Sequence, residues 1–307
     1  MFKPLFRGIC ASTVTPFDDR GELALQLLGP HIEWILAEGA DAISPLGSSG
    51  EFTAMESSDR KRVIEAALEI NNGRVPVIAG THHYSTRIAI ELSKHAEKAG
   101  ADGLLIVQPY YMAPTPTQAM DHYRRVAEAV SIPIVLYHNV RGTCVNLTTE
   151  DLMKLFEEKV IAGVKMSNPE PDRVCQLLQA TGGELTVYAG LDTAAFEALC
   201  HGAHGWISGI PSVVPRAAKE LYTAIATKGD LHLARRLWKK LAPLMRMQFS
   251  AFLSGGDGAH WLSTMKAALN LIGPPVGDPA PPVLALQEEF IPRLAAILKD
   301  LGYKVRN

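Results

Sequence analysis

The chain has 307 residues, of which 47% are hydrophobic and 20% are charged, and its formal net charge at pH 7 is -2. With a pI near 6.6 it lacks the basic excess of nucleic-acid-binding proteins, and no apolar run approaches the roughly 20 residues that span a bilayer. The segment Met1–Pro16 shows no secretory leader pattern, so we expect a cytoplasmic protein without nucleic-acid or membrane partners. The four cysteines are widely separated, which indicates free thiols rather than a zinc site or a disulfide framework.

Eight short apolar runs, each closed by Gly, Pro, Ser or Thr, predict β-strands. Most of them are nearly continuous hydrophobic segments rather than alternating ones, which is the pattern of strands that are buried on both faces. In chain order the predicted strands are Gly8–Phe17, Asp41–Gly47, Val75–Thr81, Gly103–Pro109, Ile132–His138, Val160–Ser167, Leu185–Gly190 and Gly205–Ile210.

Helical patterns lie between these strands, and several carry signals for their ends. A Thr53-x-x-Glu56 capping signal precedes the first helix, Asp192 is a good N-cap for the last, and Gly100 and Gly202 are expected to end two of them. The predicted helices are Asp59–Ile70, Thr86–Ala99, Gln118–Val130, Glu150–Glu157 and Asp192–Cys200.

The repeated strand–helix unit predicts an α/β fold, a parallel (β/α)8 TIM barrel, in residues 1–212. An open doubly wound sheet is the structural alternative, but it usually has a Gly-rich phosphate turn after its first strand, and Cys10–Asp19 contains none. Residues 213–307 follow a helical pattern only, with a Pro/Gly-rich connector at Pro274–Pro282, and are expected to form a C-terminal extension packed on the barrel. Its predicted helices are Pro215–Thr227, Leu231–Phe252, Ala259–Leu271 and Val283–Leu301.

Unusual polar residues follow three of the predicted strands, at the end of a barrel where active sites lie. Lys165 is near the end of the sixth strand, and Tyr137 ends the fifth. Burial disfavours the charged form of an amine, and the neutral amine is the form that adds to a ketone to give a Schiff base. Because adjacent strands are about 4.8 Å apart, the Tyr137 phenol can carry the proton that this addition requires.

The turn Gly47–Glu51 follows the second predicted strand and leads into a helix. Its backbone N–H groups, from Gly47 onward, can hold a carboxylate, and Ser48 and Ser49 can add hydrogen bonds or relay a proton to Tyr137. Each feature has an ordinary explanation when it is taken alone: a paired lysine, a core tyrosine and a common Ser/Gly loop. Their placement at the ends of neighbouring strands favours a catalytic interpretation.

Other polar groups are expected to play no part in the chemistry. His201-x-x-His204 has the spacing of a metal pair, but no third ligand is evident, so no metal site is predicted. Lys266 and the basic residues of Arg235–Lys240 look like a solvated helix face.

The sequence resembles the dihydrodipicolinate synthase / N-acetylneuraminate lyase superfamily of pyruvate-type aldolases. Similar segments run through nearly the whole chain, in the same order and with the same separations. They are Thr13–Phe17, Gly47–Glu51, Val77–Thr81, Ala99–Asp102, Pro109–Tyr111, Ile132–His138, Gly163–Lys165 and Gly205–Ser208.

The resemblance implies catalytic roles for four residues. Lys165 is expected to be the Schiff-base lysine and Tyr137 the proton-transfer residue, with Ser48 in the same relay. Tyr111 corresponds to the tyrosine that family members lend across a subunit interface to that relay. A homo-oligomer, a tetramer built as a dimer of dimers, is therefore expected.

The resemblance also implies how the substrate is held. Ser48 and Ser49 bind the carboxylate of pyruvate, and Gly190 and Ile207 line the pocket near the imine. Synthases of the family carry Arg-Thr-Gly after the tyrosine, and that arginine holds the carboxylate of the aldehyde.

This chain departs from that pattern, because Gly142 stands at the arginine position and Cys144 at the glycine position. Arg141, one residue away, is the candidate substitute for substrate binding. The Leu191-Asp192 pair is not the usual sialic-acid lyase pattern either.

The leading expectation is a lyase that forms a Lys165 imine with pyruvate or with a 2-oxo-3-deoxy sugar acid and needs no cofactor. An aldolase or dehydratase of sugar acids is the preferred subtype, and dihydrodipicolinate synthase, which condenses pyruvate with aspartate semialdehyde, is the alternative. A metal-dependent aldolase would need clustered His and acidic ligands, which the sequence does not offer. A non-catalytic barrel used for binding or regulation is disfavoured because Lys165 and Tyr137 are both present.

Overall fold

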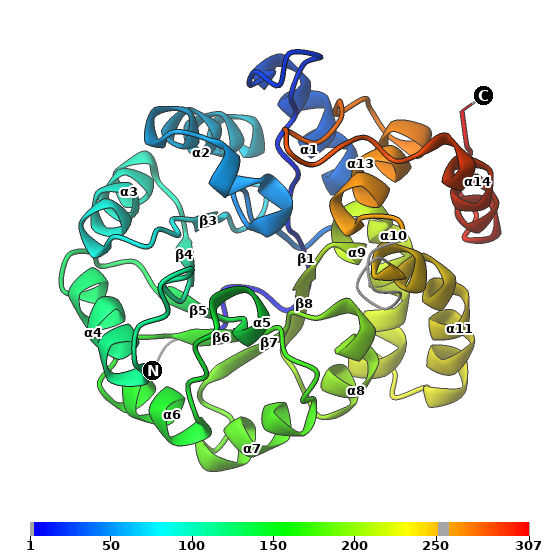
Figure 1. Ribbon diagram of the computed structural model, residues 1–307. Helices are drawn as coiled ribbons and strands as arrows, with labels where there is room; N and C mark the ends of the chain where they lie inside the picture. The colour runs from blue at the N-terminus through cyan, green and yellow to red at the C-terminus, as the bar shows by residue number, and fades with distance from the viewer. Residues whose placement is uncertain (1–2, 251–257, 307) are drawn as a thin grey trace.

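Eight parallel strands form a barrel in the part of the chain that the computed structural model describes, residues 3–250 and 258–306 (Figure 1). Hydrogen-bonded neighbours follow the order β2-β1-β8-β7-β6-β5-β4-β3, and a parallel bridge between Ile43 and Val77 joins the two ends. The predicted (β/α)8 barrel is confirmed, and each predicted strand contains an observed one. The strands are β1 (Gly8–Ala11), β2 (Ala42–Ile43), β3 (Ile78–Gly80), β4 (Gly103–Val107), β5 (Ile134–His138), β6 (Gly163–Met166), β7 (Thr186–Ala189) and β8 (Gly205–Ser208).

Helices ring the strands on the outside of the barrel (Figure 1). The strands are almost entirely buried, because side chains fill the interior while the helices cover the exterior. Short helical segments also follow β2 and β5. The helices of the ring are α1 (Leu28–Ala37), α2 (Ser57–Asn71), α3 (Thr86–Ala99), α4 (Pro116–Ala127), α6 (Thr149–Glu157), α7 (Asp172–Ala180), α8 (Ala195–Cys200) and α10 (Pro215–Tyr222), and the short segments are η2 (Ser48–Gly50), η3 (Phe52–Ala54) and α5 (Val140–Thr143).

Helix α3 shows how sequence sets an element of the ring. Ala89, Leu92 and Ala96 recur at helical spacing and are buried against the barrel. Gly100 ends the helix in a left-handed conformation with φ +99°, which glycine adopts without a steric cost. The predicted bounds of this helix are therefore confirmed at both ends.

Two predicted caps are wrong. Glu56, not Thr53, is the N-cap of α2, and no side chain caps that helix, because Thr53 lies in the separate turn η3. Asp192 does not cap α8; it lies inside the preceding turn, and its carboxylate accepts hydrogen bonds from Trp206 instead. The sequence also left α1 and α7 unpredicted.

The C-terminal segment is helical, as expected, and packs on one side of the ring beside α1 and α10 (Figure 1). The predicted helix Leu231–Phe252 ends at Gln248 in the structure, and its last two positions lie outside the described residues. Residues 283–287 are not helical, in contrast to the prediction. No helix in the described ranges is long and apolar enough to cross a membrane. The helices of the segment are α11 (Leu231–Gln248), α13 (Trp261–Ile272), η6 (Glu288–Phe290) and α14 (Ile291–Asp300).

Candidate active site

Lys165 and Tyr137 lie directly opposite each other on neighbouring strands β6 and β5. In-register residues of adjacent parallel strands project to the same side of the sheet, so both side chains share one space. The Nζ atom of Lys165 lies 3.9 Å from the centre of the Tyr137 ring. Lys165 is 3% exposed and Tyr137 is 6% exposed, so this amine and this phenol meet with little water around them.

The hydroxyl of Tyr137 is held by two further side chains. Asn139 Nδ2 donates to it at 3.2 Å, and Ser48 Oγ lies 3.5 Å away. Burial raises the pKa of Tyr137, but the charge of Lys165 and the hydrogen bonds to Ser48 and Asn139 act in the opposite direction and leave the pKa below its ordinary value. A phenol with a lowered pKa beside an amine is suited to pass a proton between substrate and solvent.

The turn after β2 brings Ser48 and Ser49 to the same space. Both residues lie in η2, a single 3-10 turn that begins after Gly47, and the first N–H groups of such a helix have no partner within it. A Cβ atom at Gly47 would come within 2.7 Å of Ser12 Oγ, so the turn packs closely against Ser12. The N-terminal end of this turn can therefore receive an anionic group.

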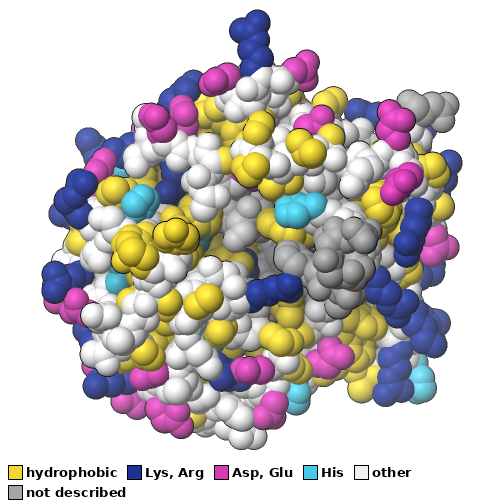
Figure 2. Space-filling model, viewed as in Figure 1, with side chains coloured by type: hydrophobic (Ala, Val, Ile, Leu, Met, Phe, Trp, Pro, Cys, Tyr) yellow, Lys and Arg dark blue, Asp and Glu magenta, His cyan; other side chains and the backbone are white. Residues whose placement is uncertain are grey.

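These residues line one cavity of about 370 Å³ at the carboxyl ends of the strands. Ser48, Ser49, Tyr137 and Lys165 are all among its lining residues. Figure 2 shows this face of the molecule, with charged side chains of both signs gathered round the periphery and a mostly uncharged centre. The predicted nucleophile, proton carrier and anion site therefore share one enclosed volume.

Gly190 gives Lys165 the room that it occupies. It follows β7, and a Cβ atom at this position would lie 2.7 Å from Lys165 Cγ and 2.8 Å from the carbonyl oxygen of Met166. Only a residue without a side chain fits between these groups. The structure thus brings Gly190 to the place where the sequence expected it.

Arg141 lines the cavity from the short helix α5, together with Gly142. Asn139 caps this helix by accepting a hydrogen bond from Gly142 N at 3.2 Å. The first residue of the helix, Val140, donates its N–H to Asn168 Oδ1 at 3.1 Å. These contacts fix α5 at the rim of the cavity.

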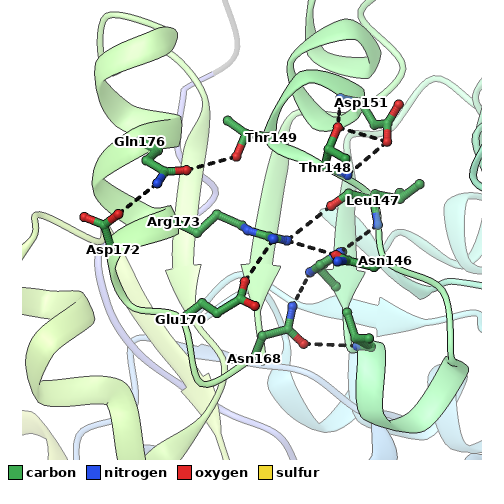
Figure 3. A network of polar contacts seen from close by, with 12 residues as sticks. Asn146, Leu147, Thr148, Thr149, Asp151, Asn168, Glu170, Asp172, Arg173 and Gln176 are labelled. Carbon is green, nitrogen blue, oxygen red and sulfur yellow. Dashed lines mark hydrogen bonds and ion pairs between the residues drawn. The ribbon is translucent and has the colours of Figure 1, made fainter.

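The network that supports α5 continues to the loop after β6 and to α7 (Figure 3). His138 ends β5, is fully buried, lies 2.5 Å from Asn168 Nδ2 and accepts from Leu147 N at 3.1 Å. Arg173 donates to Asn146 Oδ1 at 3.1 Å and to the carbonyl of Leu147 at 3.2 Å. The loops after β5 and β6 are therefore tied together by polar groups.

Asp192 is a cavity residue that the sequence placed in the wrong role. It is 2% exposed, accepts from Trp206 Nε1 at 3.0 Å and from Ile210 N at 3.3 Å, and lines the cavity. Burial raises its pKa from 3.8 to about 6, against the opposing effect of these hydrogen bonds and of Lys165. The position of Asp192 after β7 is the one feature of the sequence that points to this role.

The C-terminal segment supplies a wall of the cavity that the sequence did not predict. Gln248 from α11 and Trp261 and Met265 from α13 line the space with the barrel residues. Gln248 is 2% exposed, and its Nε2 atom has no hydrogen-bond partner among the described residues. Such contacts between distant segments leave no local pattern in a sequence.

Two predicted residues lie outside this cavity. Tyr111 is 92% exposed on the loop after β4 and has a left-handed backbone with φ 72°. Ile207 is fully buried in β8, opposite Cys10 of β1, and is not among the lining residues. Within one chain, neither of them is among the residues that line the cavity of Lys165.

The sequence predicts no part in the chemistry for Arg235–Lys240, the His201/His204 pair or Lys266. Arg235–Lys240 carries exposed basic residues, as predicted, and His204 accepts a hydrogen bond from Val187 N at 3.2 Å. The described residues contain no group of three or more His, Cys, Asp or Glu side chains that can hold a metal ion. The prediction for Lys266 is wrong: it is fully buried, and its Nζ atom lies 2.7 Å from Glu51 Oε1, because α13 faces the barrel and not solvent.

Known proteins match this chain over nearly its full length. A family model described as the dihydrodipicolinate synthetase family matches residues 5–301. The chain is similar to the 4-hydroxy-tetrahydrodipicolinate synthase of Methanocaldococcus jannaschii, with 34% identity over 97% of this chain and 99% of the relative. It is also similar to the enzyme of that name from Bradyrhizobium diazoefficiens, with 38% identity over 79% of this chain and 81% of the relative.

A solved structure is also similar to this chain over nearly its full length. The chloride-inhibited dihydrodipicolinate synthase of Acinetobacter baumannii, complexed with pyruvate, is 31% identical and superposes with a TM-score of 0.84 over 97% of this chain and 99% of that one. Sequence and fold therefore point to the same family. The chain belongs to the dihydrodipicolinate synthetase family and is an enzyme of the class I aldolase type.

Proposed function

We propose that Lys165 forms a Schiff base with pyruvate or a related 2-oxo acid and that the enzyme makes or breaks a bond at the neighbouring carbon. The observation that carries the proposal is the buried Lys165 amine 3.9 Å from the Tyr137 ring, in a cavity shared with the serine turn. The carboxylate of the 2-oxo acid binds at Ser48 and Ser49, which places its C2 carbonyl within reach of Lys165 Nζ.

The reaction begins when the neutral amine of Lys165 attacks C2 and gives a carbinolamine. Tyr137 donates a proton to the departing hydroxyl, water leaves, and an iminium forms. Asn139 keeps the phenol oriented, and Ser48 relays a proton back to it by way of the cavity. The iminium then accepts electrons from the bond to C3.

The iminium has two outcomes. In the first, the C4 hydroxyl loses its proton and the C3–C4 bond breaks, which releases an aldehyde and leaves an enamine; protonation of the enamine at C3 and hydrolysis of the imine then return pyruvate and the free amine. In a 2-oxo-3-deoxy sugar acid, loss of a proton from C3 gives the enamine, which can expel the C4 hydroxyl as water. The first route in reverse is a condensation of pyruvate with an aldehyde.

We infer that the second half of the substrate is hydroxylated. The cavity wall beyond Lys165 carries Asp192, Ser208 and Gln248, which together donate and accept hydrogen bonds from hydroxyl groups. The position where synthases hold the aldehyde carboxylate is Gly142. These features support an aldolase or dehydratase of sugar acids.

The synthase activity is the second candidate. The names of the relatives from Methanocaldococcus jannaschii and Bradyrhizobium diazoefficiens favour it, and Arg141 lines the cavity next to Gly142. If Arg141 holds a carboxylate, aspartate semialdehyde is the partner of pyruvate. A comparison of the two substrate classes decides between these candidates.

We further propose that the enzyme works as a homo-oligomer, a dimer of dimers. Tyr111 is a large side chain that is 92% exposed and held by a left-handed backbone, so it is presented away from its own barrel. In the proposed assembly its hydroxyl joins the relay of a second copy. Sedimentation of the wild-type chain and of Tyr111→Ala tests this, since a monomeric wild type excludes it.

Trapping tests the Schiff base directly. Incubation with pyruvate and borohydride should leave one covalent adduct per chain, located on Lys165 by mass spectrometry of peptides. Lys165→Met should form none, although it keeps the length of the side chain. An adduct on a different lysine, or none with the wild type, contradicts the mechanism.

A further inference from the structure

Lys266 is a fully buried lysine that pairs with Glu51, the last residue of the serine turn. Its Nζ atom lies 2.7 Å from Glu51 Oε1, and the two side chains are 0% and 4% exposed. Lys266 belongs to α13 in the C-terminal segment, whereas Glu51 follows β2 of the barrel. The pair therefore connects the two parts of the chain at the end of the barrel where the cavity opens.

Each member of the pair has further partners. Lys266 Nζ donates to the carbonyl of Asp278 at 2.9 Å and lies 4.6 Å from the centre of the Phe17 ring. Glu51 Oε2 accepts from Ala280 N at 2.8 Å. The connector between α13 and η6 thus adds two backbone contacts, as a buried charge pair requires.

Fold stability alone is a poor explanation for this pair. Removing two charges from water costs several kcal/mol per ion, about as much as their attraction returns, so apolar residues of similar size would stabilise a fold at least as well. Burial raises the pKa of Glu51 and lowers the pKa of Lys266, while the attraction between the two opposes both shifts. The pair contributes something that an apolar contact cannot, which is a fixed direction for the Glu51 side chain.

That direction matters because Glu51 terminates the turn. Its backbone is left-handed, with φ 55° and ψ 38°, a conformation that is unfavourable for a residue with a side chain. Its N–H donates to the carbonyl of Ser48 at 3.1 Å and closes the turn. An anchored side chain holds this backbone in place, and Ser48 and Ser49 are held with it.

The other side of the turn is anchored by the barrel. Thr15 Oγ1 donates to the carbonyl of Gly50 at 2.7 Å, deep in the interior. The turn therefore lies between one anchor from the loop after β1 and one from α13. Helix α13 also lines the cavity through Met265, the residue next to Lys266. A shift of this helix would move the cavity wall and the serine turn together.

We propose that Glu51 and Lys266 are positioning residues whose ion pair fixes the Ser48–Ser49 turn in the geometry that receives the carboxylate of the 2-oxo acid. The C-terminal segment then sets the affinity of the site for that carboxylate without touching it. The inference rests on the proposed function, which assigns carboxylate binding to this turn.

The first variant is Lys266→Met, which removes the ammonium group and keeps an unbranched side chain in the buried space. The readout is the pyruvate concentration that gives half of the maximal borohydride-trapped adduct on Lys165. We expect it to rise about tenfold or more, because the turn loses the charged anchor that fixes its geometry. The adduct at saturating pyruvate should still approach one per chain, since Lys165 itself is unchanged.

Lys219→Met is the control at a partly exposed lysine–carboxylate pair, whose side chains are 36% and 26% exposed. Lys219 of α10 pairs with Asp41, which precedes β2 at the opposite end of the barrel. The same substitution there breaks a lysine–carboxylate link between the C-terminal half of the chain and the barrel, far from the cavity. Its half-saturating pyruvate concentration should remain within twofold of the wild type.

A second variant covers the case in which Lys266→Met does not fold. Glu51→Gln keeps the shape of the side chain and its contact with Ala280 N but removes the charge. It should raise the half-saturating concentration by a smaller factor than Lys266→Met. The double variant should be no worse than Lys266→Met alone, because the two residues act as a unit.

Half-saturation within twofold of the wild type in folded Lys266→Met or Glu51→Gln would overturn the proposal. An equal rise in Lys219→Met would do the same, because the effect would then be one of general stability. Amide hydrogen exchange without pyruvate supplies an independent readout: the amides of residues 48–51 should exchange faster in Lys266→Met than in Lys219→Met. If the wild type forms no adduct, the proposed function fails, and the exchange experiment still decides whether the pair holds the turn.

Discussion

Gly190 lies directly against the side chain of Lys165, so that a methyl group at this position would come within 2.7 Å of Lys165 Cγ. We predict that Gly190→Ala displaces the amine and lowers the yield of pyruvate adduct by at least about tenfold, since small misplacement of a reacting group costs large factors in rate. The yield of trapped adduct per chain measures this. Gly29→Ala is the control, because a Cβ there meets nothing closer than 3.9 Å. Equal yields in both variants would contradict the steric argument.

Removal of the Tyr137 hydroxyl should lower the rate of turnover but hardly change the stability of the fold. Tyr137→Phe keeps the ring against Lys165 but loses the transferable proton, so we expect turnover to fall by about 10²–10⁴. Tyr123→Phe is the control: Tyr123 is fully buried and donates to the carbonyl of Ile106 at 3.0 Å, outside the cavity. Steady-state rates and thermal midpoints of both variants test this. If Tyr137→Phe turned over at the wild-type rate, the role of Tyr137 would be packing in the core and not proton transfer.

The raised pKa of Asp192 makes stability depend on pH. A carboxyl whose folded-state pKa is about 6 binds its proton more tightly in the folded chain than in the unfolded chain, where the value is near 3.8. Its contribution to the free energy of unfolding is therefore complete below pH 4 and is lost as pH rises to about 6, a loss of about 3 kcal/mol.

Asp192→Asn keeps the acceptor for Trp206 Nε1 and does not titrate. We predict that the variant loses less stability than the wild type between pH 4 and pH 7, as measured by urea denaturation at each pH. Parallel curves for the two proteins would show that Asp192 does not hold its proton in this way.

Substrate choice should follow the residues of α5. Because Gly142 leaves the second carboxylate without the bidentate partner that an arginine offers, aspartate semialdehyde should be a poor partner of pyruvate. Its kcat/KM should be far below that of a hydroxylated sugar acid in a side-by-side comparison. Efficient condensation with aspartate semialdehyde that is abolished in Arg141→Ala would show that Arg141 holds the carboxylate, and the synthase activity would then be the correct one.

The barrel could be predicted because its strands carry a local signal. Continuous apolar runs mark strands buried on both faces, and residues at their carboxyl ends converge whatever the intervening loops contain. Lys165 and Tyr137 were found in this way, and the register of β5 and β6 places them opposite each other. Helix α1 was not predicted; Gly29 and Pro30, two residues of low helix propensity, lie in its first turn, where proline is tolerated.

The residues that escaped prediction depend on partners far away in the chain. Lys266 has the spacing of an exposed helix face, and nothing near it reveals that Glu51 lies opposite. Asp192 has the residue type of an N-cap, but the same carboxylate also accepts from an indole, and only the fold decides which donor it meets. The periodicity of a helical segment shows on which face of the helix a side chain lies. It does not show whether that face meets solvent or another part of the fold.

The burial of Lys266 against Glu51 limits which segments of this enzyme can be exchanged with those of a relative. The last strand of the barrel ends at Ser208 and the last helix of its ring at Tyr222, but a chimera that joined them to a foreign C-terminal segment would bury Glu51 against whatever residue occupied position 266. Without a cation there, the carboxylate would be unpaired, at a cost of about 3–5 kcal/mol. In a recombination library, residues 51 and 266 therefore have to come from the same parent. The segment that must be transferred intact with this active site is longer than the barrel that contains the site.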